Sequence, residues 1–276
     1  MRSPLKMTVH RPAGRLSQYV RTFQVFSMTR PAGVSVLDFG GGNVLVPVCF
    51  GDPVLIEDSA SYELPMAAVV GPGKQATWLR FHGTIDQVNI CFLPGAAGAF
   101  VGMPAPELAG RIAPPDEVWP RAFLQAVADL QALPPRQRIS KLADLLLARL
   151  EPSRQPRAQV RQAVRLIQAT RGRVTVRSLA AQVNLSISQL ERSFTRQVGM
   201  GPKQLARQTR VSALAAEAVT LASPDWAVLA TNYGYADQAH LVREFRELTG
   251  LTPGRFANAK SDADFLQDAV AYHRAV

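Results

Sequence analysis

Hydrophobic and polar residues alternate along several short segments in the first third of the chain. The alternation in TWLRF, residues 77–81, and in QVNICF, residues 87–92, puts apolar side chains on one face of an extended strand. Turn-prone GGG, GDP and GPGK separate such segments. The pattern predicts strands at 34–39, 43–50, 53–58, 66–71, 77–83 and 86–93, which suits an antiparallel sandwich or a small barrel.

After Pro94 the period of the pattern changes from that of strands to that of helices. We expect a short helix near 95–102 and two amphipathic helices at 117–133 and 134–150. The last of these carries a leucine stripe, which either packs within the domain or forms a dimer interface, made of Leu142, Leu145, Leu146 and Leu150. The segment EPSRQPR, residues 151–157, combines two prolines with charged and polar residues and is predicted to be a linker.

From residue 158 onward the pattern predicts helices only. The first, QVRQAVRLIQATRG at 159–172, ends at Gly172. Thr175 can cap a short helix that ends at Asn184, because Asn enters the left-handed backbone conformation at low cost. Ser186 and Gln189 have the spacing of a capping box for the next helix. These signals predict a helix, a tight turn and a second helix.

This unit occurs twice, because LERSFTRQVGMGP at 190–202 matches LVREFRELTGLTP at 241–253 in Leu, Arg, Phe, Gly and Pro. The shared Leu and Phe lie one turn apart and are expected to face inward. The second copy carries Gly234 in its turn and Asp237 as its cap, and its turn is one residue longer. Between the copies, residues 202–222 can form one helix of about 20 residues and roughly 30 Å.

The outer faces of the two repeated helices suit the major groove of DNA. A helix fits this groove, where Arg can donate two hydrogen bonds to guanine. The first face carries Ser188, Glu191 and Arg192, and the second carries Gln238, Ala239, Val242 and Arg243 with His240 near its edge. A spacer of roughly 30 Å would hold both helices about one DNA turn apart, near 34 Å.

The charge is uneven along the chain and agrees with this interpretation. The formal net charge is +10; residues 151–260 hold 16 Lys and Arg against 7 Asp and Glu, whereas residues 1–150 hold 14 against 11. A basic region attracts polyanions, and no apolar run has the length of a membrane span or a signal peptide. We therefore expect double-stranded DNA as the partner, no membrane, and a cytoplasmic, nucleoid-associated protein.

The residues just described resemble a known family. GYADQAHLVREFRELTGLTPGRF at 234–256, supported by SLAAQVNLSISQLERSFTRQVGMGP at 178–202, is similar to the DNA-binding domain of AraC/XylS transcription regulators. The resemblance implies a two-domain α+β chain: a β-rich, cupin-like barrel with flanking helices, then two helix-turn-helix units joined by a long helix. It places the sensor or dimerisation domain at 1–150, the linker at 151–157, the DNA-binding domain at 158–260 and a tail at 261–276.

The resemblance also implies which residues contact DNA. They are Ser186, Ser188, Gln189, Glu191, Arg192 and Arg196 in the first unit and Gln238, Ala239, His240, Val242 and Arg243 in the second. Two alternatives stay open, since His240 could pack at the helix edge and Glu191 could act only locally. The chain departs from the family pattern where Ala257, instead of an arginine, follows Phe256.

The first half offers little catalytic chemistry. His10 and His82 are its only histidines and form no HxH pair, and no GxSxG, Walker or CxxC motif occurs. We expect no enzyme, no metal and no cofactor, and buried reduced thiols at Cys49 and Cys91. If an effector binds inside the barrel, the residues that could line its pocket are Trp78, Arg80, Asn89 and Cys91.

Together these features predict a sequence-specific DNA-binding transcription regulator, controlled by a small-molecule effector or by homodimerisation through the first half. RNA polymerase would be a further partner of an activator. The alternatives are a basic protein that binds RNA or an acidic partner without catalysis, and a cupin-like enzyme fused to a DNA-binding domain. The absence of interleaved exposed aromatics disfavours RNA.

Overall fold

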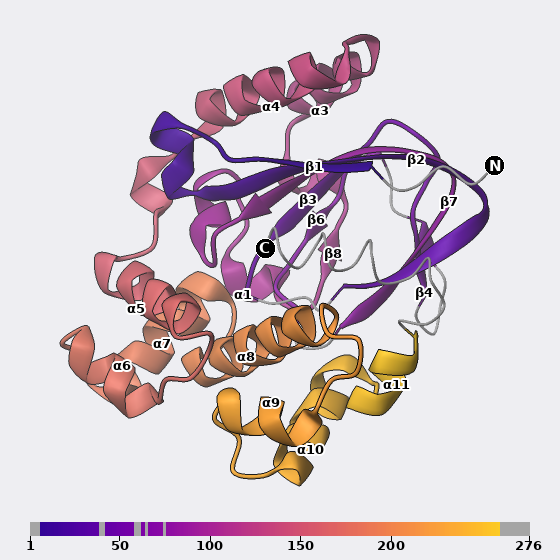
Figure 1. The fold of residues 1–276 in the computed structure, drawn as a ribbon. Helices are drawn as coiled ribbons and strands as arrows, with labels where there is room; N and C mark the ends of the chain where they lie inside the picture. The colour runs from indigo at the N-terminus through magenta and orange to yellow at the C-terminus, as the bar shows by residue number, and fades with distance from the viewer. Residues whose placement is uncertain (1–5, 39–41, 58–61, 64–65, 74–75, 260–276) are drawn as a thin grey trace.

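The computed structural model describes residues 6–38, 42–57, 62–63, 66–73 and 76–259, with a sheet in the first half and helices in the second (Figure 1). This confirms the predicted α+β fold class of two parts. The predicted tail at 261–276 lies outside the described residues. No helix among the described residues has the length and apolar character needed to cross a membrane.

The strands of the described part form one antiparallel sheet. Its hydrogen-bonded order is β1-β2-β7-β3-β6-β8, and β4 joins it through β7 while β5 pairs with β4. The bounds are β1 Lys6–His10, β2 Val20–Asp38, β3 Leu45–Cys49, β4 Leu55–Glu57, β5 Tyr62–Glu63, β6 Val69–Val70, β7 Thr77–Phe92 and β8 Ile112–Ala113.

Two long strands, β2 and β7, form the centre of the sheet and differ from the prediction. The separate strands expected at 77–83 and 86–93 are one strand, which passes through Gly83 at a φ of +66° that other residues seldom adopt. The strand expected at 34–39 is only the end of β2. The register shifts between Arg30 and Val34, where Pro31 has no N–H to donate, so the long strand bends there without ending.

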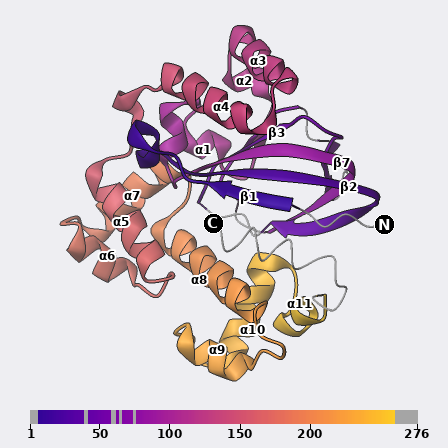
Figure 2. The same ribbon diagram turned by 45° about the horizontal axis from the view of Figure 1, so that its top comes forward.

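Helices α3 (Arg121–Ala128) and α4 (Pro135–Arg149) cover one face of the sheet (Figures 1 and 2). The leucine stripe of α4 lies in this core, with Leu142 and Leu146 buried and Leu145 and Leu150 packed against them. Of the two interpretations of the stripe, packing within the chain is confirmed. The stripe is therefore not available as an exposed dimer interface.

The single helix expected at 117–133 is wrong. The segment forms α2 (Pro115–Val118), α3 and the 3-10 turn η3 (Asp129–Ala132). Trp119 is extended, with φ −127° and ψ 144°, because the ring of Pro120 disfavours a helical residue before it. Further turns are η1 (Gly14–Gln18), η2 (Ala96–Ala99), α1 (Ala105–Leu108) and η4 (Pro152–Arg154).

Seven helices make up the second half as far as the structure describes it. They are α5 (Ala158–Ala169), α6 (Val176–Gln182), α7 (Ile187–Val198), α8 (Pro202–Ala218), α9 (Trp226–Asn232), α10 (Gln238–Thr249) and α11 (Pro253–Ala259). The turn before α7 spans 183–186 and the turn before α10 spans 233–237, so the second turn is one residue longer, as predicted.

Helix α8 joins the two units by contributing to both of their cores. Leu205 and Ala206 pack with α5, α6 and α7, whereas Val211 and Leu214 pack with α9 and α10. The helix has 17 residues, or about 26 Å at 1.5 Å per residue, and is shorter than the predicted spacer. It ends at Ala218, and turns and bends follow at residues 219–223, before Pro224.

The helical half also touches the sheet-rich half at several points. Gln208 of α8 donates a hydrogen bond to the carbonyl oxygen of Gly73, and the N–H of Ala76 donates to the carbonyl of Leu248 at 2.7 Å. Helix α1 packs against α7, so that a Cβ on Gly199 would lie 2.7 Å from the carbonyl oxygen of Ala105. The end of each repeated helix therefore contacts the first half of the chain.

Candidate nucleic-acid interface

The rotation of α7 is set by its apolar residues. Leu190 and Phe194 are fully buried against Leu179 of α6. Because residues three and four apart share a helix face, burial of this pair turns the remaining positions outward. Ser188, Glu191 and Arg192 are all exposed, as the sequence predicts.

A capping box fixes the start of α7. Ser186 accepts a hydrogen bond from the N–H of Gln189 at 3.2 Å, and Gln189 Oε1 accepts one from the N–H of Ser186 at 2.9 Å. The box is confirmed, and it satisfies two backbone donors that an uncapped helix would leave free. The preceding turn passes through Asn184 at φ +54°, also as expected. The side chains of Ser186 and Gln189 therefore fix the start of α7. This structural role is separate from the DNA contacts predicted for them.

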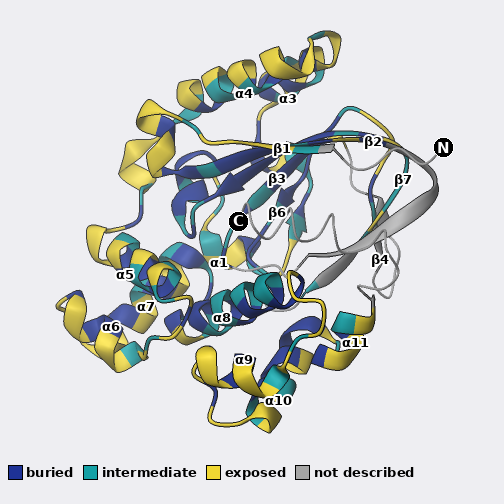
Figure 3. Cartoon of the chain, viewed as in Figure 1, coloured by how far each residue is buried: buried dark blue, intermediate teal, exposed yellow. Residues whose placement is uncertain are grey.

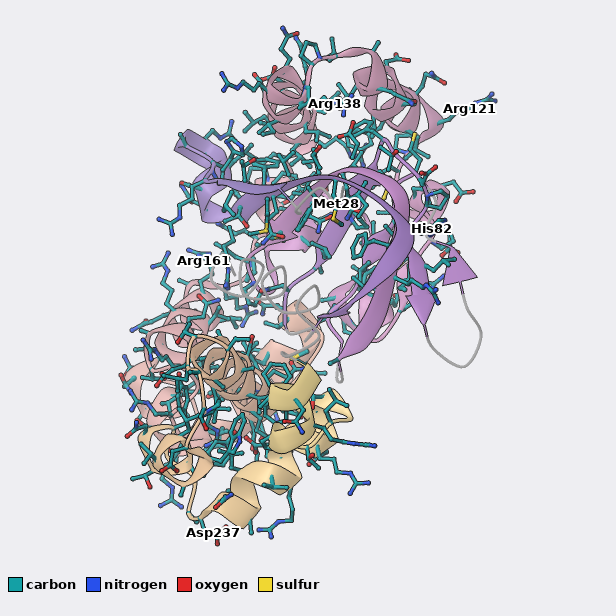
Figure 4. The ribbon with its side chains drawn as sticks, turned by 45° about the vertical axis from the view of Figure 1, so that its right-hand side comes forward. Met28, His82, Arg121, Arg138, Arg161 and Asp237 are labelled. Carbon is teal, nitrogen blue, oxygen red and sulfur yellow. The ribbon has the colours of Figure 1, made fainter. Side chains whose placement is uncertain are left out.

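The second unit repeats this construction with different capping residues. Asp237 lies at the foot of the molecule (Figure 4) and accepts a hydrogen bond from the N–H of His240 at 2.6 Å. Leu241 and Phe245 are fully buried, and Gly250 ends α10 at φ +74°. The outer surfaces of both units are exposed (Figure 3).

The predicted contact residues of α10 differ in accessibility. Gln238, Ala239 and Arg243 are exposed. His240 is partly buried and meets the ring of Tyr235 edge to face at 5.2 Å between centroids. Val242 is also partly buried and packs against the core of the second unit. His240 and Val242 therefore offer a contacting DNA less surface than their three exposed neighbours.

A buried ionic network ties α10 to α8, and the sequence analysis missed it. Glu244 accepts hydrogen bonds from Arg207 at 2.9 Å, Arg210 at 2.8 Å and the Tyr235 hydroxyl at 3.0 Å. Burial, together with the Glu244 charge, raises the pKa of Tyr235. Three donors on one carboxylate hold the helix that carries Arg243 in a single orientation. The spacing of these residues along the sequence does not predict the network, because Glu244 lies 9 to 37 residues from its partners.

A basic hollow of about 390 Å³ flanks the exposed face of α7. Its lining combines the residue before α5 with α7 and the turn before α7, and consists of Arg157, Leu185, Gln189, Arg192, Ser193 and Arg196. Arg192 and Arg196 belong to the predicted DNA-binding set, whereas Arg157 does not. Arg157 enters this site through the fold alone.

The four residues predicted to line an effector pocket all lie on β7, and the structure describes the side chains of three of them. Asn89 and Cys91 are buried on one face, while Arg80 is exposed and has the opposite strand parity. The side chain of Trp78 lies outside the described part. Asn89 and Cys91 are therefore the pair that shares a buried surface.

Around this pair the sheet has a buried polar face. Register pairs Cys91 with Thr22 of β2, and Asn89 with Gln24, and Gln87 donates a hydrogen bond to Asn89 Oδ1. Thr22 and Gln24 are buried, yet Thr22 Oγ1 and both amide atoms of Gln24 have no hydrogen-bond partner. Unpartnered polar groups are rare in protein interiors and call for a partner. The alternation in TFQVF, residues 22–26, gave no signal of this burial, because it is typical of a strand with a solvated polar face.

Both cysteines are buried and neither forms a disulfide, as expected. Burial raises the pKa of the Cys49 thiol to about 12, so this group is protonated at neutral pH. Within the described part of the chain, no three His, Cys, Asp or Glu side chains gather as a metal ion would require.

Two family models match separate parts of the chain. The family model described as a helix-turn-helix domain matches residues 179–259. A second model, described as a domain of unknown function (DUF6597), matches residues 8–114. No protein of curated function matches the sequence.

Solved structures similar to this chain include bacterial regulators. The C-terminal domain of AraT, a response regulator from Geobacillus stearothermophilus, is 24% identical, over 38% of this chain and 87% of its own, with a TM-score of 0.35. ToxT from Vibrio cholerae is 9% identical, over 86% and 97%, with a TM-score of 0.46. The fatty-acid-bound form of ToxT is 6% identical, over 90% and 97%, with a TM-score of 0.42.

Proposed function

We propose that this chain, a DNA-binding transcription regulator with an AraC-type helix-turn-helix domain in residues 179–259, reads two different half-sites through α7 and α10. Ser188, Glu191 and Arg192 would read the first half-site, and Gln238, Ala239 and Arg243 the second. Ser186, Gln189 and Arg196 would support the first helix, with His240 and Val242 at the margin of the second.

One observation carries this proposal: the two units share a scaffold but expose different side chains. Leu190 and Phe194 correspond to Leu241 and Phe245, all fully buried, so Arg192 and Arg243 leave their helices at equivalent positions. A scaffold repeated for stability alone would not require an exposed arginine at the same position in both copies. Arginine that projects from a helix into the major groove is the commonest reader of guanine.

Substitution of the two arginines tests the reading of bases. Arg192→Ala and Arg243→Ala should each weaken binding to a duplex selected from a random pool by about 1 to 3 kcal/mol, and leave binding to random duplex nearly unchanged. Dissociation constants from fluorescence anisotropy at fixed salt measure both. Arg121→Ala, which removes the same charge from α3, is the control.

Equal losses on selected and random duplex would make these arginines phosphate contacts and would refute base reading. A wild-type protein that selects no sequence, or that prefers single-stranded RNA, would refute the proposed function itself.

We further infer that a small-molecule effector controls the protein from the polar face around Gln24 and Asn89. The unpartnered hydrogen-bonding groups of Thr22 and Gln24 support this location. Contacts from Ala105 to Gly199 at the end of α7, and from the Ala76 N–H to the Leu248 carbonyl at the end of α10, offer a route by which the first half would constrain both reading helices. Dimerisation through the first half is the other form of control that we retain.

The remaining assignments follow from this function. We take residues 1–150 as the sensor domain, 151–157 as the linker and 158–260 as the DNA-binding domain. RNA polymerase would be a partner if the protein activates transcription, and the protein would act in the cytoplasm on the nucleoid.

A further inference from the structure

The basic hollow beside α7 lies on a flank of the reading helix and not at its centre. Gln189, Ser193 and Arg196 follow one another along α7 at helical spacings of four and three, so they form a single stripe, and Leu185 lies in the turn before the helix. The stripe borders Arg192 on the side away from Glu191. The hollow therefore adjoins the face that would meet DNA bases, on its cationic side.

Three arginines surround the hollow without neutralising partners. Arg157, Arg192 and Arg196 are exposed, and no acidic side chain in the described part of the chain pairs with any of them. Elsewhere in the domain, arginines such as Arg207 and Arg210 are paired with carboxylates. The flank of α7 therefore keeps its positive charge free for an outside anion.

The linker holds Arg157 at this position. Its backbone N–H donates a hydrogen bond to Gln197 Oε1 of α7 at 2.7 Å, and the carbonyl of the buried Pro156 accepts one from Arg161. Gly95, in the segment that follows β7, packs closely against Pro156 and Gln197. A Cβ atom added to Gly95 would lie 3.2 Å from Pro156 Cγ and 2.8 Å from the carbonyl oxygen of Gln197. Arg157 is therefore fixed between α7 and the first half of the chain.

The dimensions of DNA indicate which anion fits this flank. A helix with its side chains is about 10 to 12 Å across, and the major groove is about 12 Å wide. A helix lying in the groove must then meet the phosphate backbones along its flanks. Arginine binds phosphate in a bidentate manner and is therefore suited to the flank of a helix that faces a phosphate backbone.

We propose that Arg157 and Arg196 bind a backbone phosphate of the DNA strand beside α7, so that the interdomain linker supplies a DNA contact. Arg192 lies at the border of the hollow and remains available to a base. This inference rests on the proposed DNA-binding function. It adds Arg157, which lies outside both helix-turn-helix units, to the binding surface.

Arg157→Ala in the full chain tests the proposal. Because a phosphate contact carries no sequence information, binding should weaken about tenfold on selected and random duplex alike. The slope of log K against log salt should also become shallower by about one, since one fewer counterion is released. Arg157→Lys should retain part of the affinity. Arg121→Ala, far from α7 on the opposite side of the sheet (Figure 4), should change neither quantity.

The outcomes separate this proposal from the proposed function. If the wild-type protein binds duplex with a salt-dependent constant but Arg157→Ala behaves like Arg121→Ala, the phosphate site is refuted while DNA binding stands. Loss on the selected duplex only would also refute it, because that result assigns Arg157 to a base. If the wild type binds no duplex, the proposed function fails first.

A free anion is the other source of the same chemistry. We expect millimolar inorganic phosphate to leave the thermal unfolding of the wild-type protein unchanged, because the arginines are exposed and do not enclose a site. Stabilisation by phosphate that Arg157→Ala abolishes would reassign the hollow to a small anionic ligand and overturn the assignment to DNA.

Discussion

Gln24 lies near the start of β2, completely buried, with neither amide atom hydrogen-bonded. Leaving such groups unpaired costs about 1 to 3 kcal/mol of stability. A neighbour in the same sheet shows the alternative, since Gln87 donates to Asn89 and accepts from the Cys49 thiol at 3.6 Å. The amide of Gln87 has hydrogen-bond partners within the protein, whereas the amide of Gln24 has none. Gln24 is therefore the candidate ligand contact.

Replacing each glutamine by methionine, which has a similar length, should change stability in opposite directions. Gln24→Met should raise the free energy of unfolding by about 1 to 2 kcal/mol because it removes an unsatisfied buried amide. Gln87→Met should lower it, since it leaves the side chain of Asn89 without its donor. Urea unfolding followed by circular dichroism measures both. A loss at Gln24→Met as large as that at Gln87→Met would mean that the Gln24 amide has a partner after all.

At the scale of elements, α10 is held by both apolar burial and the carboxylate of Glu244. Two arginines of α8 converge on this buried group, and Arg210 also stacks over the Tyr235 ring at 4.5 Å. Arg207 reaches further, to the exposed Glu247, at 2.6 Å. Removing a buried carboxylate leaves its arginine partners charged and without a counter-charge, which is costly. Removing an exposed carboxylate costs little, because water solvates its partner.

Two substitutions on α10 test this difference. Glu244→Ala should destabilise the helical half by about 3 to 5 kcal/mol, because Arg207 and Arg210 lose a buried counter-charge. Glu247→Ala should cost less than about 1 kcal/mol, because its pair is largely solvated. Differential scanning calorimetry measures both changes. Equal effects would show that the network adds no more than a surface ion pair and does not orient α10.

At the scale of the whole molecule, the first half touches the ends of α7 and α10 and the middle of α8. Each half nevertheless has hydrophobic cores of its own, and the clusters of α5 to α11 draw almost entirely on that half. The helical half therefore has the packing of an independently stable unit. Among the residues that line the hollow beside α7, Arg157 lies before α5 and outside both repeated units.

A fragment comprising residues 158–276 should consequently fold and bind duplex DNA with salt-dependent affinity. A fragment that begins at residue 152 includes Arg157 and should bind about tenfold more tightly, with a steeper salt slope, because it retains the phosphate contact. Anisotropy titrations at several salt concentrations compare the two. A folded fragment 158–276 with no affinity for duplex would contradict the assignment of DNA binding to the helical half.

The sequence by itself determined most of the helical half. Helix ends depend on residues within three or four positions, such as Ser186 with Gln189, and Asn184 before them, so local signals suffice. The repeat at an offset of 51 then identified Arg192 and Arg243 as equivalent outward residues. The strands of the first half were less accessible to sequence reasoning, because Gly83 is typical of a turn, whereas β7 continues through it.

Only the tertiary structure decided which polar residues are buried and which distant residues share a site. Alternating Thr22 and Gln24 have the pattern of a solvated face, yet strand pairing and packing bury them beside Asn89 and Cys91. The N–H of Arg157 donates a hydrogen bond to Gln197 of α7, which is 40 residues away in the sequence. Arg207 donates one to Glu244, which is 37 residues away. Contacts of this kind arise from the packing of whole elements, and no spacing along the chain encodes them.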